Sequence, residues 1–384
     1  MTDFTEQFPY RLLRGILRYS RGTGEHWSVC KMPASFKREK GMDALLRFAR
    51  EWHADVVIGL FDPGDDLSQF RRSGIVVLAQ DHIARVPDVP NITGNYRKMG
   101  DMAARRFMAR GFREFAFFGN NGMCWSDERR DGFRDALLEA GFEGHIYLYD
   151  RRRVENLWFY YQSRLGEWLQ SLPKPVGIFA CDDNQASIVV EACNLLGFRI
   201  PYDVAVIGVD NDEIQCNLLS PSLTSIDVDI ERGGFEAASL AAHMLANPGD
   251  PGHDIVLEPL HIVTRESSNT ITTKDEMVHE ALMFIHSNVD HKIQVSDVLA
   301  HVPLSRRLLE QRFLKGTGLP IYKYIAATRV NRFTQLLLDS DDPITTISVK
   351  MDEPDPKNLA RLFRKAKGCS PTEFRQRNLR DLPE

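Results

Sequence analysis

The stretch VGIFACDDNQA, residues 176–186, combines a short apolar run with a polar turn and the start of a helix. Residues 176–180 are too few for a helix and have the apolar character of a strand that is buried on both faces. The two carboxylates and the amide that follow are typical of a turn or of a helix N-terminus. The stretch therefore predicts a strand, a turn and a helix, with polar side chains at the carboxyl end of the strand.

The same alternation extends outward from this stretch over residues 8–266. Further buried strands are predicted at 54–60, 75–79, 115–118, 145–149, 204–209 and 223–226. Amphipathic helices lie between them, including one over 133–140 and one over 157–168, where apolar residues recur every three or four positions. This alternation favours parallel sheets flanked by helices, which is an α/β architecture.

The pattern changes after residue 266. Residues 267–275 are mostly small and polar and are predicted to be a linker, and residues 276–384 have the pattern of short helices without strands. This tail has 17 Lys and Arg against 14 Asp and Glu, whereas the whole chain has 48 against 53. The difference is small, but its sign is the one expected if only the tail meets phosphate groups.

The composition limits the class of protein. A chain of 384 residues that is 43% hydrophobic and 26% charged is long enough for two or three packed cores, which excludes disorder as its main state. No apolar run approaches the roughly 20 residues of a membrane helix, and no signal peptide is apparent, so a cytoplasmic location is expected. The six cysteines are scattered without zinc-ligand spacing. They are therefore expected to be reduced, and no metal or cofactor is expected.

The first part of the tail, residues 295–315, has the pattern of a helix-turn-helix. A first helix ends at the break 301–303, and Ser305 is placed to cap a second helix in which Leu309 and Phe313 point inward. The outer face of this second helix then carries Arg306, Arg307, Glu310 and Gln311. These side chains are of the types that contact base edges in a major groove. For a single helix, a merely solvated Arg-rich face is the more frequent explanation.

Residues 344–367 repeat the pattern. Leu359 and Phe363 have the same four-residue spacing as Leu309 and Phe313. The outer face is again basic and includes Lys357, Arg361 and Arg364. Two such motifs in one tail favour DNA recognition over a solvated surface.

On these residues the tail resembles the DNA-binding domain of AraC/XylS-family transcription regulators, in which a long helix joins two helix-turn-helix motifs. The resemblance is carried by residues 304–313, by 329–338 as the joining helix, and by 363–365 and 368–375. It implies that duplex DNA is the partner and that bases are contacted by Arg307, Gln311, Lys357 and Arg361. It also implies that phosphates are held by Ser305, Arg306 and Arg364, which fix the register without specifying sequence. The two recognition helices would enter successive major grooves, about 34 Å apart.

The tail departs from this family at the second turn. The family commonly has Gly and then an aromatic or apolar residue there, whereas this chain has Asp352 and Glu353. Asp tolerates a left-handed backbone better than most residues, so the turn is expected to survive. Two acidic side chains close to phosphate are expected to weaken DNA binding by the second motif.

The α/β part resembles the two-lobed sugar-binding domain of periplasmic binding proteins and LacI-type repressors. The resemblance is carried by residues 129–133, 180–186, 206–211 and 219–226. Such a domain in front of an AraC-type tail is similar to the xylose-operon regulators of enteric bacteria, to which residues 125–129 are an especially close match. This resemblance implies a sugar effector such as D-xylose and a homodimer formed through the front domain. RNA polymerase would be a further partner if the protein is an activator.

A candidate sugar site follows from the strand pattern and this resemblance. In open α/β sheets, ligands bind beyond the carboxyl ends of the strands. The residues just past a predicted strand or extended run are Asp62, Asn95, Trp125, Asp183 and Asp210, and the resemblance adds Arg129. Carboxylates accept hydrogen bonds from sugar hydroxyls, arginine donates in a fork, and tryptophan covers the apolar ring face. Asp and Asn after strands also serve as ordinary turn and helix-capping residues.

The front domain departs from its relatives at its start. They begin with an apolar strand before the helix that matches residues 10–19, whereas only Met1 to Phe8 precede it here. Residues 2–4 are the candidate stub of such a strand. Without this strand, buried backbone groups would lose their partners, so we expect either a start further upstream or a compromised first lobe.

Two other functions stay open at this point. One is an α/β enzyme, for which the paired acids Asp182 and Asp183 are the only hint, and no nucleophile-elbow, phosphate-loop or dinucleotide-binding motif supports it. The other is a sugar-binding protein without functional DNA binding. Salt-dependent binding to duplex DNA separates a sugar-responsive regulator from both.

Overall fold

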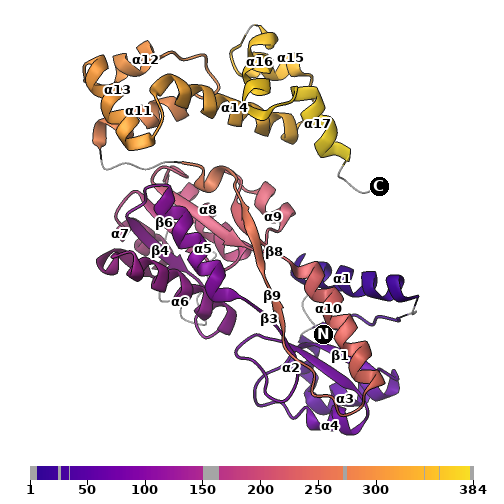
Figure 1. Ribbon diagram of the computed structural model, residues 1–384. Helices are drawn as coiled ribbons and strands as arrows, with labels where there is room; N and C mark the ends of the chain where they lie inside the picture. The colour runs from indigo at the N-terminus through magenta and orange to yellow at the C-terminus, as the bar shows by residue number, and fades with distance from the viewer. Residues whose placement is uncertain are drawn as a thin grey trace. The chain divides into compact units, whose positions relative to one another are not determined.

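The chain folds into two compact units, Met1–Thr270 and Ile271–Glu384. The computed structural model describes residues 7–24, 27–33, 35–149, 164–270, 275–340, 342–353 and 355–380. Figure 1 shows an α/β first unit and a second unit built from helices, which confirms the predicted fold class. Within these described residues, no helix has both the length and the apolar character needed to cross a membrane.

The first unit contains two lobes, each built around one sheet. The sheet of the first lobe is parallel, with the strand order β1-β2-β3-β9. Its strands are β1 (Val56–Leu60), β2 (Val76–Gln80), β3 (Asn91–Gly94) and β9 (Ile255–Leu257). Its helices are α1 (Gln7–Thr23), α2 (Ser35–Lys40), α3 (Met42–Glu51), α4 (Ser68–Arg72) and α10 (Ile230–Ala246). Helices α1 and α10 pack along each other, although most of the chain lies between them in sequence.

The sheet of the second lobe has the strand order β10-β8-β7-β6-β4-β5. Its strands are β4 (Glu114–Phe118), β5 (Ile146–Leu148), β6 (Val176–Ala180), β7 (Val204–Val209), β8 (Thr224–Val228) and β10 (Pro259–Val263). Its helices are α5 (Tyr96–Ala109), α6 (Cys124–Glu139), α7 (Arg164–Ser171), α8 (Asp183–Leu195) and α9 (Glu213–Leu218). All neighbouring strands are parallel except β10, which is antiparallel to β8.

The apolar strands of the second lobe are buried on both faces. Phe115 and Phe117 of β4 belong to the apolar cluster that contains residues of α5 and α6. Ala116 and Phe118 belong to the cluster that contains residues of α7 and α8. Because successive side chains of a strand point to opposite faces, a continuous apolar run supplies both clusters.

The predicted strands are all present, with ends that differ by at most two residues. Strands β3, β9 and β10 were not predicted, because β3 and β9 are only four and three residues long and β10 has two exposed positions. The sheets are parallel as predicted, except for β10, which is antiparallel to β8. The helix predicted at 133–140 is the end of α6, whereas the one predicted at 157–168 falls mostly outside the described residues and is described only as part of α7.

The predicted linker needs a correction at its beginning. Ser267 is fully buried, donates from its Oγ to the Val206 carbonyl at 2.7 Å and accepts from the Thr224 amide at 2.8 Å. Ser268 is also buried and donates to the Thr224 hydroxyl. Because their hydroxyls form hydrogen bonds within the first unit, where a linker would contact solvent, both residues are part of that unit. Residues 271–274, and the candidate strand stub at 2–4, lie outside the described residues.

The second unit consists of helices around two apolar clusters. The helices are α11 (Glu276–Ser287), α12 (Val295–His301), α13 (Arg306–Thr317), α14 (Ile321–Asp339), α15 (Ile344–Lys350), α16 (Pro356–Lys367) and α17 (Pro371–Arg380). The first cluster joins α11, α12 and α13 to Tyr324 and Ile325 of α14. The second joins α15, α16 and α17 to Val330 and Phe333 of the same helix. The two predicted helix-turn-helix motifs are therefore present, and α14 is the joining helix.

Candidate functional site

A cavity of about 320 Å³ lies in the first unit where the lobes meet. Within the described residues, the chain passes between the lobes after β3, after β8 and after β9, and Gly94, Val228 and Leu257 from these three passages line the cavity. Its polar lining comes from both lobes: Gln7, Gln80, Asp81, His82 and Tyr96 from the first lobe or its exit, and Arg129, Asp182, Asp183, Asn184, Asp210 and Asp212 from the second. Trp125 adds an aromatic surface. Polar groups from strand ends thus converge on one cavity, as small-molecule sites require.

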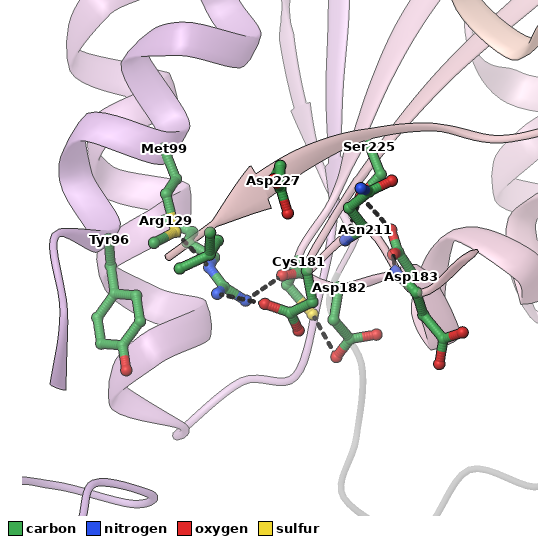
Figure 2. A network of polar contacts seen from close by, with 12 residues as sticks. Tyr96, Met99, Arg129, Cys181, Asp182, Asp183, Asn211, Ser225 and Asp227 are labelled. Atoms are coloured by element: carbon green, nitrogen blue, oxygen red, sulfur yellow. Dashed lines mark hydrogen bonds and ion pairs between the residues drawn. The ribbon is translucent and has the colours of Figure 1, made fainter. Parts of the chain in front are cut away.

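Arg129 is the central cation of this cavity. It lies on α6, is 5% exposed, and donates to the Cys181 carbonyl. Its Nη2 lies 3.5 Å from Oδ1 of Asp210. The guanidinium lies 5.1 Å from the ring centre of Tyr96 and 5.5 Å from that of Trp125. Figure 2 shows the guanidinium directed at Cys181, with Tyr96 and Met99 on its other side. These contacts fix the orientation of the guanidinium.

Glycines allow α6 to approach α5 closely enough to hold Arg129 in place. A Cβ on Gly132 would lie 2.1 Å from the Arg97 carbonyl oxygen. A Cβ on Gly100 would lie 2.2 Å from the carbonyl oxygen of Arg129 itself. Residues 129–133, which carried part of the sequence resemblance, therefore combine the cavity arginine with the glycine that positions it.

Asp183 holds the neighbouring turn. Its carboxylate accepts from Ser225 Oγ at 2.6 Å and from the Asp212 amide at 2.8 Å, and burial raises its pKa well above the ordinary value. Its neighbour Asp182 accepts from the Gln185 amide and caps α8. The two acids therefore have structural partners, which removes the reason for assigning them to catalysis.

The turn at Asp210 has an unusual backbone. Asp210 has φ = 97° and Asn211 has φ = 50°, which is the left-handed region that non-glycine residues seldom adopt. Arg11 of α1 donates to the Asp210 carbonyl at 2.7 Å, and Arg265 donates to the Asn211 side chain at 2.9 Å. Strained backbone held by surrounding contacts is frequent at ligand sites. Since α1 belongs to the first lobe, Arg11 also connects that lobe to the turn.

The first lobe contributes residues that the sequence analysis missed. Asp81 accepts from Tyr96 Oη at 2.8 Å and from Thr93 Oγ1 at 2.6 Å, and burial raises its pKa. Asp81 and His82 follow β2 directly. Polar residues just past other predicted strands were taken as site candidates. The same rule, applied to the strand predicted at 75–79, would have identified Asp81 and His82.

Four of the six predicted sugar-site residues line the cavity, namely Trp125, Arg129, Asp183 and Asp210. Asp62 and Asn95 are not among its lining residues. Asp62 accepts from Lys37 Nζ at 2.7 Å, and Asn95 donates to Glu258 at 3.1 Å. Their polar groups thus have partners elsewhere in the first unit.

In the second unit, both recognition helices present the predicted polar faces. Leu309, Phe313, Leu359 and Phe363 are buried. The seven candidate DNA-binding residues are all exposed: Ser305, Arg306, Arg307 and Gln311 at α13, and Lys357, Arg361 and Arg364 on α16. Arg306 pairs with Glu310 at 3.1 Å, whereas Arg361 donates to Asn358 at 3.2 Å. The two faces are therefore available for phosphate and base contacts.

Of the two acidic residues at the second turn, Asp352 lies as expected and Glu353 does not. Asp352 has φ = 50°, so it adopts the left-handed conformation anticipated for it. Glu353, by contrast, is only 5% exposed and pairs with Lys292 Nζ at 3.0 Å. Burial alone would raise the pKa of Glu353, but hydrogen bonds from Lys292 and Asn358 lower it below the ordinary value. The expectation that this carboxylate repels phosphate is wrong, because it points into the unit.

Comparison with known proteins agrees with this geometry. Residues 104–268 match a periplasmic binding protein-like domain, and residues 298–377 match a helix-turn-helix domain. The xylose operon regulatory protein of Haemophilus influenzae is 31% identical over 294 residues, which are 75% of this chain and 75% of that protein. The chain belongs to the family of xylose operon regulatory proteins.

Two further comparisons extend the match to nearly the whole chain. The xylose operon regulatory protein of Escherichia coli K12 is 28% identical over 364 residues, 93% of each chain. The solved structure of the xylose-binding transcription activator XylR has a TM-score of 0.74 at 25% identity and covers 98% of this chain and 97% of that one. Like these xylose operon regulatory proteins, the chain is a sugar-responsive transcription regulator with a DNA-binding helix-turn-helix domain, and it is not an enzyme.

Proposed function

We propose that the effector is a pentose of the D-xylose type and that it binds in the cavity between the lobes. The observation that carries this proposal is the meeting of Arg129, Asp210 and Trp125 at one cavity of about 320 Å³. The guanidinium donates to ring or hydroxyl oxygens, the Asp210 carboxylate accepts from hydroxyls, and the indole covers an apolar ring face. The names of the xylose operon relatives support the choice of pentose.

Asp183 has a supporting role in this proposal. Both of its oxygens already accept hydrogen bonds, one from the Asp212 amide beside the turn that carries Asp210 and one from Ser225 of the neighbouring strand β8. It therefore shapes the cavity wall and orients the residue that meets the sugar. Asp62 and Asn95 are omitted from the proposed site because neither lines the cavity.

For DNA, we infer that Arg307, Gln311, Lys357 and Arg361 contact bases and that Ser305, Arg306 and Arg364 contact phosphates. Exposure of all seven on two helices of one unit supports this division. Residues 1–266 would then form the sensing domain and residues 276–384 the DNA-binding domain. The buried Ser267 and Ser268 extend the first of these domains beyond residue 266, to the unit boundary at Thr270.

The assembly that we propose is a homodimer formed through the first unit, located in the cytoplasm. Two copies would place two DNA-binding units on one operator, so that both half-sites contribute to affinity. RNA polymerase would be a third partner where the operator lies in an activating position.

Thermal unfolding of the full chain with and without candidate sugars tests the effector. A ligand that binds only the folded state raises Tm, so D-xylose at 100 times its Kd adds about 2.7 kcal/mol. D-xylose, L-arabinose, D-ribose and D-glucose are compared on the wild type, on Arg129→Met and on Arg130→Met. Arg130 is a matched control on the same helix that pairs with Asp127 and does not line the cavity.

The expected result is a Tm increase with D-xylose that persists in Arg130→Met and is absent in Arg129→Met. A cooperative transition that no sugar shifts would contradict the proposed effector class. A shift that Arg129→Met retains would place the sugar elsewhere.

A further inference from the structure

The two helix-turn-helix motifs have separate apolar clusters that share one helix. Tyr324 and Ile325 at the start of α14 belong to the first cluster, and Val330 and Phe333 further along belong to the second. Of the four residues between them, 326–329, Arg329 is the buried one, with 6% exposed. The connection between the motifs is thus a short stretch of helix that ends in a buried cation.

Arg329 contacts the segment that leads into the first motif and the turn of the second motif. Its Nη1 donates to the His291 carbonyl at 3.0 Å, just before α12 of the first motif. Its Nη2 donates to the Met351 carbonyl at 2.9 Å, at the turn of the second motif. Its Nη2 also lies 3.9 Å from the Glu353 carboxylate, an ion pair rather than a hydrogen bond.

Glu353 connects the same two parts of the unit through its carboxylate. Oε1 of its buried carboxylate accepts from Lys292 Nζ at 3.0 Å and from Asn358 Nδ2, at the start of the second recognition helix, at 3.2 Å. The Lys292 amide also donates to the Asp352 carboxylate at 3.3 Å. One carboxylate is therefore bonded to Lys292, in the segment that leads into α12 of the first motif, and to a residue of α16.

This arrangement has an energetic consequence. A buried carboxylate is destabilising unless its partners are in place, and an apolar side chain at the same position would serve stability at least as well. Charged groups, however, have strict requirements of distance and direction, so they favour one arrangement of the parts that carry them. Glu353 therefore contributes more to a unique geometry than to stability.

We propose that Lys292, Arg329 and Glu353 form an inter-motif bridge that fixes the orientation of α16 relative to the first motif. Through that orientation, the bridge sets the spacing between the two DNA segments that one copy of the protein recognises. Glu353 and Lys292 are positioning residues, since neither belongs to the exposed faces proposed to touch DNA. The inference rests on the proposed contact of both motifs with one duplex.

The test measures spacing tolerance. A duplex that the wild-type full chain binds tightly is selected from a random library, and variants of it are made with one base pair added or removed between the two recognised segments. Each base pair changes their separation by about 3.4 Å along the axis, with a rotation of about 35°. Affinities are measured for the wild type, Glu353→Gln, Lys292→Met and Asp342→Asn. Asp342 is the matched control, because its exposed ion pair, at 2.7 Å, is with Lys350 at the end of α15.

For the wild type and Asp342→Asn, we expect altered spacing to reduce affinity at least about tenfold. For Glu353→Gln and Lys292→Met, affinity at the selected spacing falls about tenfold, while the penalty for altered spacing shrinks to about threefold or less. A bridge that contributes only stability would lower Tm and leave the spacing penalty of the folded protein unchanged, which would overturn the inference. Lys292 is half-exposed, so its variant provides the answer if Glu353→Gln does not fold.

The outcomes also separate this inference from the proposed function. If the affinity of the wild-type protein does not change with the spacing of the two DNA segments, the contact of both motifs with one duplex is refuted. A wild type that responds to spacing, together with bridge variants that respond equally, would refute the bridge alone.

Discussion

Nη2 of Arg129 lies 3.5 Å from Oδ1 of Asp210 in the wall of the cavity between the lobes. The two groups come from α6 and from the end of β7, and both line the same space. The distance is at the outer limit of a hydrogen bond, so neither group is saturated by the other. A sugar hydroxyl between them can accept from the cation and donate to the carboxylate.

Replacement of Asp210 by Asn removes the acceptor charge and keeps the size of the side chain. Asn also tolerates the left-handed backbone of this turn, so the fold is expected to persist. The affinity for D-xylose, measured by calorimetric titration, falls about 10- to 100-fold because a hydrogen bond to a charged group contributes about 1.5–3 kcal/mol. The exposed pair of Asp135 with Arg97 supplies the control Asp135→Asn, which retains wild-type affinity. Equal affinity for all three proteins would remove Asp210 from the site.

A methyl group at Gly132 is predicted to weaken sugar binding without touching the cavity. The added Cβ would lie 2.1 Å from a backbone oxygen of α5, so the two helices have to separate and Arg129 moves with α6. Gly132→Ala therefore lowers D-xylose affinity at least about tenfold and destabilises the first unit by about 1–3 kcal/mol. Gly144→Ala is the control, since a Cβ there meets nothing within 4 Å. Wild-type binding by Gly132→Ala would show that helix spacing does not position Arg129.

Acid is predicted to destabilise the second unit through His286. Burial lowers the pKa of this imidazole to about 4, against 6.5 when it is exposed. Between these two values the unfolded chain binds a proton that the folded unit does not, so stability is complete above pH 6.5 and decreases as the pH falls toward 4. The loss reaches about 3 kcal/mol.

Urea unfolding at several pH values checks this prediction. His286→Gln should reduce the dependence on pH between 6.5 and 4, whereas a substitution of the exposed His291 by Gln should not. The prediction fails if the wild type and His286→Gln lose stability in parallel across this range.

The two kinds of DNA contact should respond differently to sequence and salt. Arg307→Ala is expected to reduce the binding free energy by about 1–3 kcal/mol on the selected operator and by little on random duplex, because contacts to bases determine sequence specificity. Arg364→Ala should weaken both duplexes about equally and make the slope of log K against log salt less steep by about one. Binding titrations at several salt concentrations distinguish the two patterns. Identical behaviour of both variants would contradict the division into base and phosphate contacts.

The sequence predicted the parts of the fold that depend on local pattern. Strands such as 176–180 and 204–209 were located to the residue because continuous apolar runs are required for burial on both faces. Leu309 and Phe313 were placed correctly because a helical period defines an inner face. Strand β3 was missed, since its four residues include no run long enough to show a period.

The site was less predictable, because its geometry depends on contacts between distant segments. Asp62 and Asp210 both follow strands, yet only Asp210 lines the cavity, and no local pattern separates them. Glu353 appeared to be a surface acid because its partners Lys292 and Arg329 lie 61 and 24 positions away along the chain. Such partners are visible only when tertiary structure is available.

The most direct test of a sugar-responsive regulator is the affinity of the full chain for its selected operator, measured by fluorescence anisotropy with and without saturating D-xylose. We predict a change in operator affinity of at least about fivefold in the wild type and in Arg130→Met, and none in Arg129→Met. An operator affinity that stays the same while the same sample demonstrably binds the sugar would show that the protein does not respond to this sugar.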